Sequence, residues 1–444
     1  MRNFFVTPEV PKAAPKALSV EEQTDALIAS EESFQEFMAA DAETTRAMEI
    51  AAGLENLAMV AGHVTEARNT DLAFFDAGLG LALVGTGIGT EEIAPGLEDM
   101  EGKTISTEAV KETVQKIWDA IKKVIANMWK QIQIFWGNMT KSAPGLKLRA
   151  EALSEKVTEL GSATAEEKTF SPGRALKTLS VNGQVPKKGS DLIEGLSLVE
   201  SISSHLYGKY KEQLVKAGKD IDAAIGEFDV ASIESARSSL DAVSSAYAGI
   251  HEISEFKGVK MVKVGRDTRF NRSESVEAVH LPTDMAIFHV EAPVEENEDV
   301  LGRAERLRKA SLVVMQSSEQ EAKSKDKEVE MEVFATSDVV TIAERCIAIC
   351  DMVADHDAKA VKAVADNIIK ASDTLNKKFK DASKEESGVS SASSYVDSAM
   401  KFNIAFTTAS TKFEAQVSRV AMTTVRAALS VAQSNLSQYK KDKA

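Results

Sequence analysis

Residues 117–136 read IWDAIKKVIANMWKQIQIFW and contain all three tryptophans of this 444-residue chain. The apolar residues recur at intervals of three, four and seven, which is the spacing of one face of an α-helix. This face consists of Ile117, Trp118, Ile121, Val124, Ile125, Met128, Trp129, Ile132, Phe135 and Trp136. The sequence therefore predicts an amphipathic helix over residues 107–136, which ends at Gly137-Asn138.

The opposite face of this predicted helix is basic, with Lys116, Lys122, Lys123 and Lys130. Residues 111–150 hold eight basic and two acidic residues, for a net charge of +6. One interpretation is a core helix with a solvated basic face. The others are a membrane-surface helix and an element that faces nucleic-acid phosphates. Because the aromatic residues continue the apolar face, the pattern favours packing or membrane insertion over base stacking.

Helical spacing recurs through most of the remaining chain, apart from a loop rich in Gly, Ser and Pro at residues 161–190. The last predicted helix follows a serine-rich break at residues 387–394. The other predicted helices span residues 18–68, 146–160, 191–217, 218–252 and 337–380.

Strand patterns occur only in the segment 256–335. The runs at 259–264, 285–291, 310–315 and 328–334 are rich in β-branched residues or alternate between apolar and polar ones. A short helix is expected at residues 300–308. The predicted fold class is therefore mainly α, an elongated helical bundle with a small inserted α+β module. The expected regions are 1–108 (acidic, helical), 109–255 (helical, beginning with the Trp/Lys helix), 256–335 (α+β insert) and 336–444 (long helices).

The net charge of -15 is concentrated at the N-terminus. Residues 1–110 hold six basic and 20 acidic residues, a net charge of -14, whereas the remaining 47 basic and 48 acidic residues nearly cancel. The whole chain therefore does not have the basic surface of a general nucleic-acid coat protein. The asymmetry indicates that the N-terminal region has a separate role.

No catalytic, cofactor-binding or metal site is predicted. The six histidines form no recognisable motif. His356 stands among three aspartates, Asp351, Asp355 and Asp357, and a solvated acidic helix face is favoured there over a cation site. Cys346 and Cys350, one helical turn apart, are expected to be buried. The histidines are His63, His205, His251, His280, His289 and His356.

A membrane span is not favoured either. Residues 72–90 are the nearest candidate, but they contain Asp76 and five glycines, and a spanning helix needs about 20 mostly apolar residues. A membrane-active protein of the pore-forming kind, which would insert residues 72–90 and 117–136, remains an alternative. A helical adaptor or enzyme with an α+β insert is another.

An acidic helical region with small-x-Glu steps, a basic Trp/Phe-rich helix and then PGLKLRAEAL at residues 144–153 resemble the internal head proteins of large tailed bacteriophages. The resemblance covers about residues 20–160. It implies a non-enzymatic virion protein inside the capsid, present in the host cytoplasm during assembly. Implied partners are other capsid or inner-head proteins, the head maturation protease and, through weak nonspecific contacts, packaged DNA; a membrane partner is not favoured.

The resemblance also implies that the maturation protease removes an acidic propeptide, cutting after Glu in a small-x-Glu step. The step Ser106-Thr107-Glu108, followed by Ala109, lies where the acidic region ends and the Trp/Lys helix begins. A cut there would remove -14 of the net charge of -15 and leave a nearly neutral protein. The other candidate steps end at Glu21, Glu31, Glu49, Glu55 and Glu98.

Overall fold

The structure is a computed structural model that describes most of the chain from Thr107 onward. The N-terminal segments 18–68 and 72–90, for which helix and membrane insertion were considered, lie outside the described residues. The described residues are 107–161, 163–229, 232–251, 255–256, 259–265, 267–271, 274–318, 329–356, 362–364, 366–367, 370–371, 373–375, 377 and 389–440.

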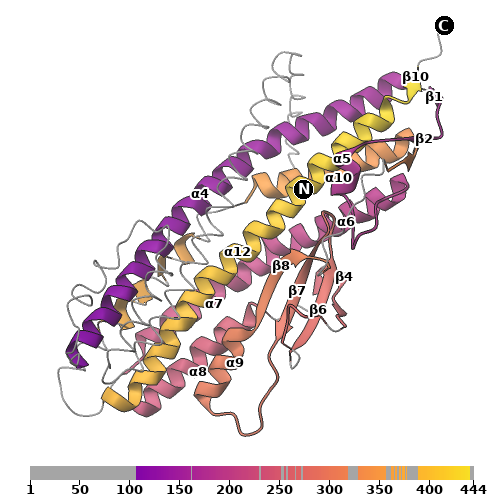
Figure 1. The fold of residues 1–444 in the computed structure, drawn as a ribbon. Coiled ribbons are helices and arrows are strands. Elements are labelled where there is room, and N and C mark those ends of the chain that lie inside the picture. The colour runs from indigo at the N-terminus through magenta and orange to yellow at the C-terminus, as the bar shows by residue number, and fades with distance from the viewer. Residues whose placement is uncertain are drawn as a thin grey trace, which may run out of the picture.

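Two long helices form the body of the protein. Helices α4 (Thr107–Leu160) and α12 (Val389–Leu436) run side by side in the same direction, and α10 (Thr336–Ala354) packs against both (Figure 1). Helix α12 begins within the serine-rich stretch, which the sequence had predicted to be a break. The bundle is elongated and mainly α, so the predicted fold class is confirmed.

The predicted end of the first helix at Gly137-Asn138 is wrong, because α4 continues through these residues and through Pro144. Interior Gly and Pro cost a helix about 1 and 3 kcal/mol relative to Ala. Each large apolar side chain that is fully buried returns about 1.5–3 kcal/mol, so a continuous buried face outweighs both breakers. That face consists of Phe135, Trp136, Met139, Ala143, Leu146, Ala150 and Leu153.

The predicted boundary between residues 217 and 218 is also wrong. Helix α6 (Gly189–His205) continues through a π-helical turn, η1 (Leu206–Tyr210), into α7 (Lys211–Gly226). Gly218 does not end the helix; a Cβ there would lie 2.5 Å from Cγ1 of Val364, so this glycine permits a close approach. The next helix is α8 (Ile233–Gly249), and at its start Ser232 Oγ accepts a hydrogen bond from the Ser235 N–H.

A four-stranded antiparallel sheet packs beside these helices, in the order β5-β6-β7-β8 (Figure 1). Its strands are β5 (Val262–Lys263), β6 (Ser275–His280), β7 (Met285–Glu291) and β8 (Ser311–Gln316), and α9 (Val300–Lys309) connects the last two. The predictions for β7, β8 and α9 are confirmed to within one residue. Strand β6 was not predicted, because SVEAVH lacks a clear period of two.

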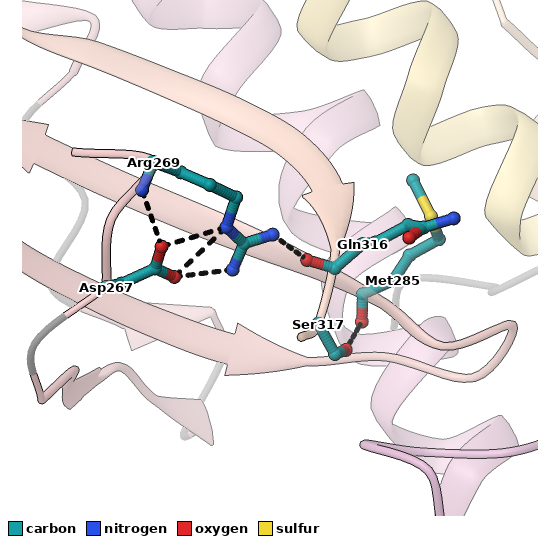
Figure 2. Close-up of polar contacts among 5 residues, drawn as sticks. All are labelled: Asp267, Arg269, Met285, Gln316 and Ser317. Atoms are coloured by element: carbon teal, nitrogen blue, oxygen red, sulfur yellow. Dashed lines mark hydrogen bonds and ion pairs between the residues drawn. The ribbon is translucent and has the colours of Figure 1, made fainter. Parts of the chain in front are cut away.

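One face of the sheet joins the main core, and the other face has a small apolar cluster of its own around Phe288. Arg269 secures the loop that covers this second face. Figure 2 shows its guanidinium group donating hydrogen bonds to the Asp267 carboxylate and to the Gln316 carbonyl. The same guanidinium lies 5.0 Å from the ring centroid of Phe288 and 5.8 Å from that of Phe270, which are cation–π distances.

Three two-stranded pairs complete the set of described strands; the first two connect distant parts of the chain, and the third joins neighbouring segments. Strand β1 (Thr164–Ala165) pairs with β10 (Tyr439–Lys440), β2 (Thr169–Phe170) with β9 (Met331–Glu332), and β3 (Glu255–Phe256) with β4 (Val259–Lys260). The strand predicted at residues 328–334 is thus only β9, and it pairs outside the four-stranded sheet. The short helix α5 (Arg174–Thr178) follows β2.

The end of α12 is fastened to the segment before α10 through a buried asparagine. The Asn435 side chain accepts a hydrogen bond from the Phe334 N–H at 3.0 Å and donates one to the Phe334 carbonyl at 2.9 Å. The Tyr439 hydroxyl also donates to that carbonyl, at 2.9 Å. Satisfying these backbone groups matters because an unpaired buried one costs about 1–3 kcal/mol.

A substitution at Gly189 tests this junction, because Gly189 begins α6 and packs closely against Phe334. A Cβ at this position would lie 2.8 Å from both Cβ and Cγ of Phe334. We therefore expect Gly189→Ala to lower the free energy of unfolding by about 1–3 kcal/mol, measured by chemical denaturation. The control Gly195→Ala lies in the same helix, 3.4 Å from Pro282 Cγ, and should gain up to about 1 kcal/mol from helix propensity. Equal effects of the two substitutions would contradict this packing.

Candidate functional site

The basic and aromatic residues predicted to carry function all lie on α4. Trp118, Lys122 and Trp129 lie on this helix, but their side chains are outside the described residues. Lys123 and Lys130 are exposed, whereas Trp136 is buried in the core. For Trp136 the structure therefore supports the interpretation as a core residue. It gives no membrane-facing role to this side chain.

Three of the exposed lysines of α4 form a straight row. Lys123, Lys130 and Lys141 are seven and eleven residues apart, which places them within about 20° of one line along the helix. At a rise of 1.5 Å per residue the row is about 27 Å long. We call these three residues the lysine row.

The next two basic residues of α4, Lys147 and Arg149, make contacts with other helices of the same chain. Lys147 Nζ lies 2.7 Å from Asp351 Oδ1, and this hydrogen bond raises the pKa of Lys147. Arg149 donates hydrogen bonds to Ser430 and Gln433 of α12, and burial lowers its pKa. These contacts hold α4 against α10 and α12, in contrast to the lysine row.

Of the four residues at the predicted cleavage step, Ser106 lies outside the described residues. Thr107, Glu108 and Ala109 are the first three residues of α4. The peptide bond between Glu108 and Ala109 therefore lies in the first turn of the helix. The first four N–H groups of a helix have no partner within it, so this turn opens more easily than the interior.

A buried polar cluster lies where α4, η1 and α12 meet His356, two residues beyond the end of α10. The ring of His356 lies against that of Trp136, with centroids 3.8 Å apart and planes inclined by 33°. His356 Nε2 is 3.3 Å from Glu414 Oε1, and the two side chains are 0% and 1% exposed. The prediction that His356 lies on a solvated acidic face is wrong, because the helix ends at Ala354 and the chain then turns this residue inward.

Burial dominates the electrostatics of this cluster. It raises the pKa of Glu414 to about 8, although the positive charge of Lys211 opposes the shift. The hydroxyl groups of Tyr207 and Ser418 are 2.6 Å apart, and burial raises the pKa of Tyr207 as well. Near neutral pH the carboxyl group of Glu414 is therefore largely protonated, which avoids most of the cost of a buried charge.

Catalytic or metal chemistry finds little support among the described residues. No three His, Cys, Asp or Glu side chains in this part of the chain gather to hold a metal ion. Cys346 and Cys350 are buried, as predicted, and burial raises the pKa of the Cys350 thiol to about 12, so it stays protonated and unreactive. His251 is buried too, and its pKa is lowered to about 3, mainly by burial.

Sequence reasoning missed Glu414, Tyr207 and Ser418. A signal for Glu414 exists, because Glu414, Val417 and Ala421 follow helical spacing and are all buried. A glutamate within an apolar face indicates a buried carboxyl group. No local signal connects it to His356, since the two residues meet only in the folded bundle.

A scan against protein families matched residues 19–434 to the family described as phiKZ-like phage internal head proteins. The match covers α4 with the lysine row, the sheet and all but the last two residues of α12. Searches of the curated proteins and of the solved structures gave no match.

The Glu414 carboxyl group should make stability depend on pH. Its ordinary pKa is 4.5, and in the folded chain it is about 8. The protonated carboxyl group therefore stabilises the fold fully below pH 4.5, and this contribution is lost as the pH rises to about 8. We expect Glu414→Gln, whose amide does not titrate, to remove that part of the decline in the free energy of unfolding. The exposed control Glu212→Gln should keep the wild-type profile; an unchanged profile for Glu414→Gln would show that the carboxyl group does not behave this way.

Proposed function

The chain belongs to the phiKZ-like phage internal head proteins, and on this premise we propose that it is made as an acidic precursor that the head maturation protease cuts after Glu108. Membership makes it a structural protein of the phage head, located in the capsid interior. It also indicates association with other capsid components. The precursor, its cleavage and its non-enzymatic role are our proposals.

The charge distribution is the observation that carries the proposal. Residues 1–108 contain six basic and 20 acidic residues, a net charge of -14, and the remainder has a net charge of -1. Packaged DNA presents a dense array of phosphates that would repel such an acidic segment. Removing the segment leaves a nearly neutral protein whose first helix has a basic exposed side.

The position of the Glu108–Ala109 bond supports the same cut. It lies in the first turn of α4, which can open for a protease without unwinding the helix interior. The core residues that the structure describes begin at Phe135. Cleavage therefore removes none of these residues and leaves the contacts of α4 with α10 and α12 in place.

A non-enzymatic role fits the described polar cluster. His356 and Glu414 are the pair most similar to a catalytic acid–base arrangement, yet their side chains are almost completely shielded from solvent. A substrate would have to displace Trp136 and Tyr207 to reach them. We propose that this cluster stabilises the bundle and takes no part in a reaction.

The membrane-active alternative has less support. None of the helices in the described part of the chain combines the length and apolar character that a membrane crossing requires. The apolar side of α4 is occupied by the protein core from Phe135 onward. The other proposed inserting element, residues 72–90, lies outside the described residues.

Mass spectrometry of purified virions tests the proposed cut. We expect a mature N-terminus at Ala109 and strong depletion of peptides from residues 1–108. In phage carrying Glu108→Gln this depletion should disappear, since the residue that the protease recognises is lost. Glu112→Gln is the matched control, because Glu112 follows Val110-Lys111 and has no small residue two positions before it. Peptides from residues 1–108 at the same abundance as the rest would refute cleavage, and an N-terminus after Glu98 would refute this site alone.

A further inference from the structure

The lysine row lies in a part of the chain with no acidic residues. No aspartate or glutamate occurs between Asp119 and Glu151, although the whole chain contains 68. Lys123, Lys130 and Lys141 are exposed, and none of them has an ion pair or hydrogen bond to another residue that the structure describes. Exposed lysines on protein surfaces are usually interspersed with acidic side chains, so this stretch of α4, about 27 Å long, itself presents charge of one sign.

The cations that come next on α4 are paired, unlike those of the row, and the exposed Lys156 further along stands next to the acidic Glu155. Lys147 and Arg149, only a few residues further on, contact Asp351, Ser430 and Gln433. The seven apolar side chains that form the inner face of the same helix, from Phe135 to Leu153, are buried. The helix therefore offers solvent a line of positive charge, and its described aromatic residues, Phe135 and Trp136, are buried.

We propose that the lysine row binds the phosphate backbone of double-stranded DNA without sequence preference. The inference rests on the location in the capsid interior, where DNA is packaged, and does not depend on the proposed cleavage. B-form DNA carries one negative charge per about 1.7 Å of its axis, so a straight 27 Å row meets phosphates along its entire length. The ammonium groups of lysine act as point charges and do not read base edges, which makes the contact independent of sequence.

The row suits DNA better than a membrane. A membrane-surface helix inserts an apolar face beside its lysines, and the described apolar face of α4 is covered by α10 and α12. Among the side chains of α4 that the structure describes, Ile134, at 42% exposed, is the exposed large apolar one beside the row. One such residue does not form an inserting face. An acidic head protein is the alternative ligand for the same lysines, and the experiment below distinguishes binding of such a protein from binding of DNA.

The proposal predicts how strongly the affinity for DNA depends on the salt concentration. Each lysine–phosphate contact releases counterions and contributes about -0.9 to the slope of log affinity against log salt concentration. Three contacts therefore contribute about -2.7. Between about 50 and 200 mM salt this component of the affinity falls about 40-fold.

The test is a fluorescence anisotropy titration of a labelled duplex of about 30 base pairs, which is longer than the row. The full-length chain is measured before and after cutting at a specific protease site introduced after Glu108, with circular dichroism to verify the helix content. The variant Lys123→Gln/Lys130→Gln/Lys141→Gln removes the row. The matched control Lys209→Gln/Lys216→Gln/Lys219→Gln removes three exposed lysines from η1 and α7, with the same change in net charge.

We expect the cut chain to bind duplexes of unrelated sequence equally. The row variant should lose about 2.7 from the magnitude of the salt slope, and the control variant should keep the wild-type slope. Equal losses in the two triple variants would overturn the proposal, because binding would then follow net charge and not position. Absence of DNA binding in both the cut and uncut chain would also overturn it. If, in that case, the wild-type chain bound acidic head proteins and the row variant did not, the row would be a protein-binding surface. Mass spectrometry of virions judges the cleavage separately.

Discussion

A helix as long as α4 keeps its apolar side away from water only if partners cover that side along the length of the helix. Its 54 residues span about 81 Å, and no compact globular core offers a surface of that length. The described buried face, from Phe135 to Leu153, is covered by α10 and α12. The elongated shape of the molecule follows from this requirement, and the sheet is an addition to one side of the bundle (Figure 1).

The core between these helices also holds a histidine and a glutamate. His356 follows the last turn of α10, at the position where Trp136 of α4 and Glu414 of α12 come closest to it. Two ionisable groups at this junction are compatible with a dry core if they share one proton, because the pair is then neutral overall. Replacing either one by an apolar residue would leave the other without its partner. Trp136, His356 and Glu414 thus bring α4, the segment after α10 and α12 together at one buried point.

Much of the fold could be predicted because its strongest signals are local. The helical period of residues 117–136 and the β-branched runs of β7 and β8 specify their own elements. Predictions failed where a distant contact outweighs a local preference. Gly137-Asn138 and Pro144 are local helix breakers, but the buried face on both sides of them continues. In the candidate site, the exposure of Lys123 and Lys130 followed from helix geometry alone. The pairing of His356 with Glu414 did not, because 58 residues separate them and each lies on a different segment of the bundle.

The two ends of the bundle differ in a way that matters for electrostatics. Helix α4 begins at one end, and at the other end Asn435, Tyr439 and the β1–β10 pair fasten the end of α12 (Figure 1). At physiological ionic strength the screening length is about 8 Å, so these ends are about ten screening lengths apart. A change of charge at the start of α4 is therefore not felt at the fastened end. The two ends of the protein are therefore electrostatically independent. A partner that binds at the fastened end meets the same electrostatic potential whether or not the charge at the other end changes.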